Sequence, residues 1–377
     1  MNHEHDLKVG DLSEAHLIRR FVPLLMADTA TESENVSPYQ LLGPGDDCAV
    51  VAAPDQRFVI STDTQVQGQD FELTWPSGVE PSGADTGHKC ATQNLADAAA
   101  MGAVPSALVI SLTLPQHTPV RWVEDFARGV RAGTIACGAP QCYVVGGDLG
   151  AGREISVTAT VTGDLEGRHP VRRHGARPGD MVVLAGHVGR AAAGLDLLRS
   201  ATYKPGRNAS LDALVDSQLR PVSPVVMGAQ LAQVGATSMI DVSDGLVRDL
   251  SRIAEASGVN MVLEPHALEQ LGAELGRAAD LLGVDPLHWV LHGGEDHGLL
   301  STLPPETTLP PGVCPIGSVL AMPPGKPLEQ VAITEPHGDP SRLEAEQRVW
   351  VSDTPVNQLP GSLRERGWDH FEPKDGF

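Results

Sequence analysis

Apolar residues recur at two spacings along the chain, and these predict helices and strands in alternation. Residues 11–30 carry apolar side chains three and four positions apart, the spacing of one helix face. The Ala-rich stretch 86–101 predicts a second helix, on which Lys89, Gln93 and Asp97 share one face. A third helix is predicted at 122–136, and short apolar runs predict strands at 58–61, 106–114, 143–145 and 155–161. Strands and helices in this order predict an α/β (α+β) fold.

A basic, turn-rich segment, EGRHPVRRHGARPGD, follows this first set of elements and predicts a link to a second set. There the pattern predicts strands at 181–184, 239–242, 261–263, 299–302 and 315–319, and helices at 189–199, 225–233, 246–256 and 268–282. Residues 203–220 are mostly polar, and 322–345 predict an exposed loop. Because 377 residues also suggest two domains, we expect domains at 1–165 and 166–377.

Composition narrows the class of protein. The formal charge of -21 and an aromatic content of 4% argue against a nucleic-acid surface, which is basic and offers stacking platforms. None of the five cysteines forms a CxxC pair, and Cys137 and Cys142 have no histidine at zinc-ligand spacing. The polar N-terminus and the lack of an apolar run near ~20 residues lead us to expect a cytoplasmic protein without a membrane partner.

Seven aspartates stand at the ends of apolar runs or inside glycine-bracketed turns: Asp46, Asp47, Asp63, Asp97, Asp148, Asp241 and Asp244. Aspartate is a poor former of helices and strands, so this placement needs a reason. One reason is that carboxylates cap helices and start turns. The other is that carboxylates gathered in one cleft repel each other unless cations lie between them, and Mg²⁺ bridges carboxylates to substrate phosphates.

Local context leaves both interpretations open at each position. Ser61, Thr62 and Asp63 are three consecutive oxygen ligands at a predicted strand end, or a simple turn. Asp97 either pairs with a neighbour such as Lys89 or faces a functional site. Asp148 follows two glycines, where a phosphate could approach the backbone closely. The usual nucleotide-binding loops G-x-x-x-x-G-K-[ST] and G-x-G-x-x-G do not occur, so phosphate handling would have to depend on metal and glycine.

The order of these motifs resembles the thiamine-monophosphate kinase family, within the ATP-binding superfamily of aminoimidazole ribonucleotide synthetase. The matching pieces are GDD, STDT, NLADAAAMGAVP, GGD, RHGARPGD, IDVSDGL and GGED over about residues 40–320, with RGWDHF at 366–371. The resemblance implies two α/β domains and a homodimer whose N-terminal sheets close into a barrel. It also implies binding of ATP and several Mg²⁺ ions, with transfer of the ATP γ-phosphoryl group to thiamine monophosphate to make thiamine diphosphate.

The resemblance also assigns roles residue by residue. It implies the Mg²⁺ ligands Asp47, Ser61, Thr62, Asp63, Asp97, Asp148, Asp241 and Asp244. It implies ATP contacts from Gly147, Asp148, Arg173 and Ser243, of which Asp148 and Arg173 are also the catalytic candidates. It implies that Asp70, Glu295 and Trp368 lie at the thiamine phosphate. Asp46 is left as a turn residue.

Two segments depart from the family pattern. Asp70 stands where the family often has histidine, and GGEDHGL stands for GGEDYEL, which brings in His297 and Gly298. His297, like His88 and His292, is either a proton carrier or a packed side chain. Two alternatives therefore stay open: another superfamily member, such as a selenophosphate or aminoimidazole ribonucleotide synthetase, and a non-catalytic paralogue that binds nucleotide or thiamine.

Overall fold

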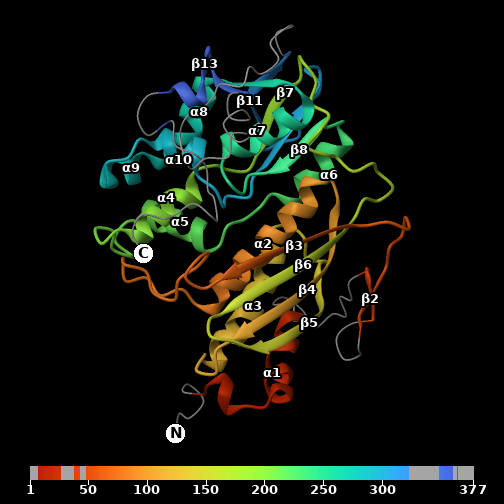
Figure 1. Ribbon diagram of the computed structural model, residues 1–377, viewed down its shortest axis with the longest axis vertical. Helices are drawn as coiled ribbons and strands as arrows, with labels where there is room; N and C mark the ends of the chain where they lie inside the picture. The colour runs from red at the N-terminus through yellow and green to blue at the C-terminus, as the bar shows by residue number, and fades with distance from the viewer. Residues whose placement is uncertain (1–6, 27–37, 43–47, 322–347, 360–362, 364–377) are drawn as a thin grey trace, which may run out of the picture.

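The computed structural model describes residues 7–26, 38–42, 48–321, 348–359 and 363, and two β-sheets organise them (Figure 1). The first is four-stranded, with the order β3-β6-β4-β5. Its strands are β3 (Val59–Val66), β4 (Val104–Leu114), β5 (Tyr143–Ala151) and β6 (Ser156–Asp164). β4 pairs with β5 in parallel and with β6 in antiparallel fashion, so the sheet is mixed.

Three helices lie against one face of this sheet: α1 (Glu14–Met26), α2 (Gly83–Ala100) and α3 (Val120–Ala136). α2 begins with a capping box, in which the side chain of Asp85 accepts the backbone N–H of Ser82 at 2.7 Å. α2 and α3 approach closely because glycine occupies their contact. A Cβ atom at Gly83 would lie 1.9 Å from the carbonyl oxygen of Trp122, which leaves no room for a side chain.

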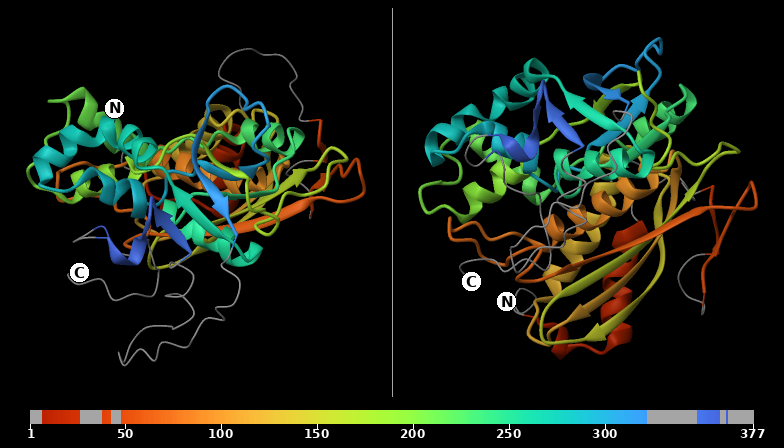
Figure 2. Two further views of the ribbon diagram at one scale, coloured as in Figure 1. Left: turned by 90° about the horizontal axis from the view of Figure 1, so that it is seen from above. Right: turned by 45° about the horizontal axis from the view of Figure 1, so that its top comes forward.

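The other face of the four-stranded sheet is covered by no element of the described part of the chain, as the right view of Figure 2 shows. Ile60 is 63% exposed on it and Val109 is 43% exposed. Threonines continue the same face, where the hydroxyl groups of Thr64 and Thr158 lie 2.8 Å apart. This open face combines apolar and hydroxyl side chains, a composition that fits contact with another surface better than exposure to water.

The second sheet has seven strands in the order β13-β12-β9-β11-β7-β10-β8. The strands are β7 (Met181–Ala185), β8 (Ser238–Asp241), β9 (Asn260–Leu263), β10 (Leu299–Leu303), β11 (Val313–Leu320), β12 (Val349–Val351) and β13 (Thr354–Pro355). The helices of this half are α4 (Arg190–Arg199), α5 (Ala209–Leu219), α6 (Val225–Gln233), α7 (Leu246–Ser257), α8 (Pro265–Gly272), α9 (Gly276–Leu282) and α10 (Pro286–His292). Short pieces complete the described chain: β1 (Gln40–Leu42), β2 (Val50–Val51), η1 (Val9–Asp11), η2 (Ala273–Leu275) and η3 (Val356–Gln358).

The two halves share a hydrophobic core. Leu95 on α2 and Leu108 on β4 belong to the same buried cluster as Leu231 on α6 and Met239 on β8. The predicted boundary at residue 165 falls between β6 and β7, where the chain passes from one sheet to the other. No described helix is long and apolar enough to cross a membrane.

Most predicted elements form, with four corrections. The helix predicted at 268–282 is divided, because α8 ends at Gly272, η2 follows and α9 begins at Gly276. β3 extends beyond the predicted strand at 58–61, and Phe58 is 54% exposed, so that strand is not buried. β5 continues through the glycines that we interpreted as a turn, because its pairing with β4 extends to Ala151. The mostly polar stretch contains α5, which begins where the side chain of Asn208 accepts the backbone N–H of Ser210. The predicted loop 322–345 lies outside the described residues.

Candidate functional site

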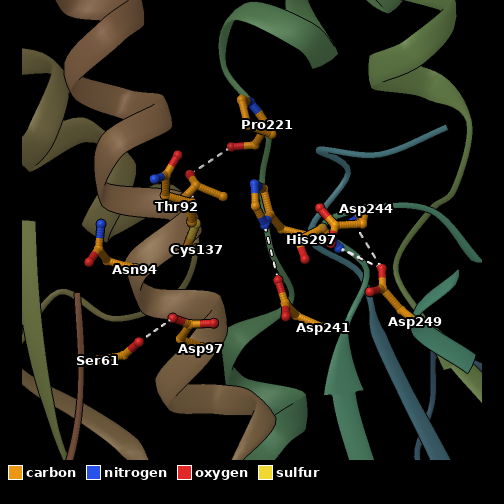
Figure 3. A network of polar contacts seen from close by, with 12 residues as sticks. Ser61, Thr92, Asn94, Asp97, Cys137, Pro221, Asp241, Asp244, Asp249 and His297 are labelled. Atoms are coloured by element: carbon orange, nitrogen blue, oxygen red, sulfur yellow. Dashed lines mark hydrogen bonds and ion pairs between the residues drawn. The ribbon is translucent and has the colours of Figure 1, made fainter. Parts of the chain in front are cut away.

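Three carboxylates from three elements meet where the two sheets adjoin. Asp63 comes from β3, Asp97 from the last turns of α2 and Asp241 from the end of β8. In Figure 3 the carboxylate of Asp97 is bonded to Ser61 and that of Asp241 to His297. Burial raises the pKa of Asp97 to about 6, and the negative charges of Asp241 and Asp63 add to the rise. Asp97 therefore interacts electrostatically with Asp63 of its own half and with Asp241 of the second half.

The spacing of Lys89, Gln93 and Asp97 predicted that they share one face of α2, and Gln93 and Asp97 on this face contact β3. Ser61 Oγ donates a hydrogen bond to Asp97 Oδ2 at 2.5 Å, and Gln65 Nε2 donates to Gln93 Oε1 at 2.7 Å. Ser61 and Gln65 both belong to β3, so alternate residues of this strand line the same helix face. The alternative pairing of Asp97 with Lys89 is wrong, because Lys89 is ion-paired with Glu295.

That ion pair joins the two halves of the protein. Lys89 Nζ lies 2.6 Å from Glu295 Oε1, and Gln218 Nε2 donates to Glu295 Oε2 at 2.6 Å. Burial acts to raise the pKa of Glu295, but Lys89 and Gln218 outweigh it and hold that pKa below its usual value. Lys89 also donates to the backbone carbonyl of Asp70 at 3.2 Å. The carboxylate of Asp70 accepts a hydrogen bond from the backbone N–H of Val66 at 2.8 Å.

His297 is a site residue whose role the sequence left open. Its ring Nδ1 lies 3.2 Å from Asp241 Oδ2, and the side chain is buried. Burial acts to lower the pKa of His297, but Asp241, Glu295 and Asp63 together raise it. Glu295 and His297 both have positive φ, at 67° and 52°, which is uncommon for residues other than glycine. The sequence signal that drew attention to His297 was the departure of GGEDHGL from the family pattern GGEDYEL.

The turn 293–298 is held against the turn after β8 by backbone hydrogen bonds. Glu295 N–H donates to Ser243 O at 2.9 Å and His297 N–H donates to Val242 O at 3.0 Å. Its middle residue, Asp296, accepts the N–H groups of Gly189 and Ala191 at the start of α4. Burial raises the pKa of Asp296 to about 7, and these N–H groups oppose the rise. The turn thus contacts β8, α4 and, through Glu295, α2.

A second acidic group lies beside the first but is built differently. Asp249 Oδ2 accepts the backbone N–H groups of Ser243, Asp244 and Gly245, and its Oδ1 accepts from Arg252 at 2.6 Å. Burial raises the pKa of Asp249 to about 7, although Arg252 opposes this. Asp244 binds Arg252 at 2.5 Å and lies 3.8 Å from Arg248. Asp244, a predicted Mg²⁺ ligand, therefore has arginine partners in this structure.

Several predicted site residues lie apart from the three carboxylates. Thr62 alternates with Ser61 and Asp63 and so lies on the open face of the sheet, where it accepts a hydrogen bond from Thr160. Asp148 is also exposed on that face, because it pairs in register with Ser111 of β4. Of the three consecutive residues, Ser61 and Asp63 thus face α2, whereas Thr62 faces the opposite side of the sheet.

Gly147 lies next to Asp148 within β5, and Arg173 is exposed on the segment that leads to the second sheet. Ser243 sits in the turn after β8, half-buried, with its N–H bonded to Asp249. Asp46, Asp47 and Trp368 lie outside the described residues.

The possible metal ligands of this site have the chemistry that Mg²⁺ prefers. The three carboxylates and the Ser61 hydroxyl offer only oxygen, the ligand that Mg²⁺ takes. Among the described residues no three His, Cys, Asp or Glu side chains form a ready metal-holding group. Mg²⁺ usually keeps several waters and binds one or two carboxylates together with substrate phosphates, so a preformed cage is not required. The residues fit such a shared ion.

Comparisons with known proteins identify the family. The family model described as AIR synthase related protein, N-terminal domain, matches residues 45–165. The thiamine-monophosphate kinase of Mycobacterium tuberculosis is 43% identical over 282 residues, covering 74% of this chain and 79% of the relative. The chain belongs to the thiamine-monophosphate kinase family. The enzyme of that name from Corynebacterium glutamicum is 38% identical over 298 residues, covering 78% and 82% of the two chains.

A solved structure supports membership in the thiamine-monophosphate kinase family. It is described as AaThiL complexed with AMPPCP and TMP, and it matches with a TM-score of 0.67 and 27% identity. The match covers 97% of this chain and 99% of that one. The mixed α/β fold that the motifs predicted is therefore confirmed.

Proposed function

We propose that this protein transfers the γ-phosphoryl group of ATP to a phosphate oxygen of thiamine monophosphate, forming thiamine diphosphate and ADP. Membership of the thiamine-monophosphate kinase family supports this activity, and so does the structural relative that is described with AMPPCP and TMP. The family match favours this activity over those of other superfamily members.

One observation from the structure carries the proposal: Asp97 of the first half is buried and interacts with the negative charges of Asp241, in the second half, and Asp63. Folding brings these carboxylates together at a cost, since burial and the two neighbouring charges destabilise the ionised form of Asp97. A protein retains such repulsion where a ligand relieves it, and perturbed carboxylates of this kind are typical of functional sites. ATP and thiamine monophosphate are themselves anions, so a cation is required between them and the site.

We assign Asp63, Asp97 and Asp241, with Ser61, as the residues that would hold Mg²⁺. Bound Mg²⁺ supplies charge neutralisation at the phosphates and at the transferred group. The bond between the γ-phosphorus and the ADP oxygen breaks as the bond to the thiamine monophosphate oxygen forms. Because the attacking phosphate oxygen is already anionic near neutral pH, no general base is required. Positioning and electrostatics then supply most of the rate.

The remaining assignments follow from the family motifs. Gly147, Asp148, Arg173 and Ser243 are proposed at ATP, and Asp47, Thr62 and Asp244 as further Mg²⁺ ligands. For Thr62 and Asp148 this role places phosphate at the open face of the sheet. For Asp244 it requires that Arg252 release the carboxylate. Glu295, Asp70 and Trp368 are proposed at thiamine monophosphate, with Lys89 as the cation that orients Glu295.

A homodimer is part of the proposal. The open face of the four-stranded sheet exposes Ile60 and Val109, and a second copy of the same sheet would cover them. Such closure into a barrel would also place Thr62 and Asp148 at the interface between the copies. The prediction is a dimer mass in sedimentation equilibrium, reduced to a monomer by Ile60→Lys.

The activity is tested directly. Purified protein is incubated with ATP, Mg²⁺ and thiamine monophosphate, and thiamine diphosphate is separated and measured. We expect product formation that stops when Mg²⁺ is chelated, and none when free thiamine replaces the monophosphate. Folded protein that binds ATP and yet forms no product above background would refute the proposed function.

A further inference from the structure

A cavity of about 920 Å³ lies on the side of α2 away from the carboxylate site. Its walls come from α2, α3, the loop before α4 and the segment between α5 and α6, represented by His88, Arg128, His187 and Val222. None of the site residues assigned above lines it within the described part of the chain. Its volume is in the range of sites that hold small organic molecules.

Two elements separate this cavity from the carboxylate site. On α2, His88 lines the cavity and Asp97 faces the carboxylates, nine residues apart; at about 100° per residue they lie on opposite sides of the helix. In the turn 293–298, Asp296 lines the cavity, whereas Glu295 and His297 contact Lys89 and Asp241. The cavity is thus a separate site with its own side chains.

The lining of the cavity has an apolar part. Val222 is 51% exposed and Val226 is 47% exposed, and both lie in its wall beside Met227 and Ala132. Exposed valines that share one wall leave an apolar surface suited to the rings or alkyl groups of a ligand.

The lining also has a cationic part, although the chain as a whole carries a charge of -21. Arg128, Arg190 and Arg220 lie in the wall with Asp216 and Asp296, but Arg190 is bound to Glu274 and Arg220 to Asp216 and Asp85. Asp296 is bonded to the start of α4, and Asp216 to Arg220. Arg128 shares Asp125 with Arg121, so one carboxylate serves two guanidinium groups. Arg128 is therefore the arginine of this wall whose charge is least compensated, and it is the one placed to bind an anionic group.

A buried hydroxyl in the same wall lacks a partner. Ser223 is 0% exposed, lines the cavity, and its Oγ makes no hydrogen bond to any described residue. Two residues before it, the carbonyl oxygen of Pro221 accepts a hydrogen bond from Thr92 Oγ1 at 2.8 Å and lies 3.0 Å from His88 Nε2. A buried polar group left unsatisfied costs about 1–3 kcal/mol.

We propose that this cavity is a second binding site, specific for a small organic anion with an apolar body. The guanidinium of Arg128 meets the anionic group, and Val222, Val226 and Met227 contact the apolar body. This inference is independent of the proposed kinase activity.

The test uses 8-anilinonaphthalene-1-sulfonate, an aromatic sulfonate whose fluorescence rises on binding, titrated into the full chain. Arg128→Gln is compared with Arg121→Gln, its matched control, since both arginines bind Asp125 and only Arg128 lines the cavity. Ala132→Trp fills the apolar wall. N-phenyl-1-naphthylamine, which has the same rings without the sulfonate, reports the contribution of the negative charge.

We expect saturable binding that weakens at least about tenfold in Arg128→Gln, is lost in Ala132→Trp and is unchanged in Arg121→Gln. That loss is about 1.4 kcal/mol or more, a charge-assisted hydrogen bond. The uncharged probe binds at least about tenfold more weakly, and saturating ATP with thiamine monophosphate does not displace the sulfonate. Equal affinity in all variants, equal affinity for both probes, or displacement by the two substrates would overturn the proposal.

Discussion

Two groups of carboxylates lie on either side of the turn after β8, and the protein treats them in opposite ways. Asp244 and Asp249 are bound to Arg252, and Asp249 also accepts three backbone N–H groups. Asp97, by contrast, has a serine hydroxyl as its hydrogen-bond donor, and the charges of Asp241 and Asp63 raise its pKa. The two groups contain the same kind of side chain in adjoining positions.

The difference separates structure from function. A carboxylate that arginine and backbone N–H groups satisfy stabilises the fold, and removing it leaves those donors without a partner. A carboxylate that faces other carboxylates is destabilised in its charged form in the isolated protein. Its retention makes sense when a cation and a phosphate complete the arrangement. Substitution should therefore reduce stability in the first group and activity in the second.

The largest effect is expected from Asp249→Ala. It removes the acceptor of three N–H groups in a buried place and one of the two carboxylates that bind Arg252, and we expect a loss of about 4 kcal/mol in the free energy of unfolding. Urea unfolding measures it. A loss below about 1 kcal/mol would mean that the arginine-bound group is not structural, and the comparison would fail on that side.

Asp97→Asn is the matched substitution in the other group. We expect turnover to fall at least about 100-fold, because a charge that positions the phosphates is removed. The free energy of unfolding should stay the same or rise, since like-charge repulsion is relieved. Kinetics and urea unfolding of one preparation measure both; a variant that is destabilised but turns over normally would reverse the assignment.

The pH dependence of stability sharpens the same contrast. The pKa of Asp97 in the folded protein, about 6, lies above its unfolded value of 3.8, so protonation favours the folded state. The stability that Asp97 contributes is complete below pH 3.8 and is lost as pH rises through about 6. In metal-free buffer, wild type should lose about 1 kcal/mol relative to Asp97→Asn between pH 5 and 7. Parallel pH profiles would show that Asp97 does not titrate there.

The smallest effect concerns His297, which contacts Asp241. His297→Phe removes one hydrogen bond, worth about 1 kcal/mol, and should raise the Mg²⁺ concentration for half-maximal rate about three- to tenfold. His297→Gln, which keeps a donor, should recover part of this. If both variants reach half-maximal rate at the same Mg²⁺ concentration as wild type, His297 contributes only to packing.

Spacing and motif order predicted much of this arrangement. The shared face of Lys89, Gln93 and Asp97 follows from helical periodicity, and Asp241 was correctly placed at the end of a strand. The partner of Lys89 could not be predicted, because Glu295, which also accepts from Gln218, reaches Lys89 only through the packing of the two halves. No local signal distinguishes Lys89 bound to Glu295 from Lys89 bound to Asp97.

The wrong predictions share one physical cause. Glycines before Asp148 predicted a turn, but pairing with β4 extends β5 through them, and strand alternation then places Asp148 beside Ser111 on the open face. The same alternation separates Thr62 from its neighbours Ser61 and Asp63. Partner strands and register depend on contacts distant in sequence, which a single local pattern does not contain.

The most direct test of the carboxylate site is calorimetric titration with AMPPCP, with and without Mg²⁺, in wild type, Asp97→Asn and Glu255→Gln. Glu255 is an exposed acid on α7 and serves as the control. We predict that Mg²⁺ strengthens AMPPCP binding at least about tenfold, or 1.4 kcal/mol, in wild type and in Glu255→Gln, and less than about twofold in Asp97→Asn. Equal strengthening in all three proteins would contradict the assignment of these carboxylates to Mg²⁺ and phosphate.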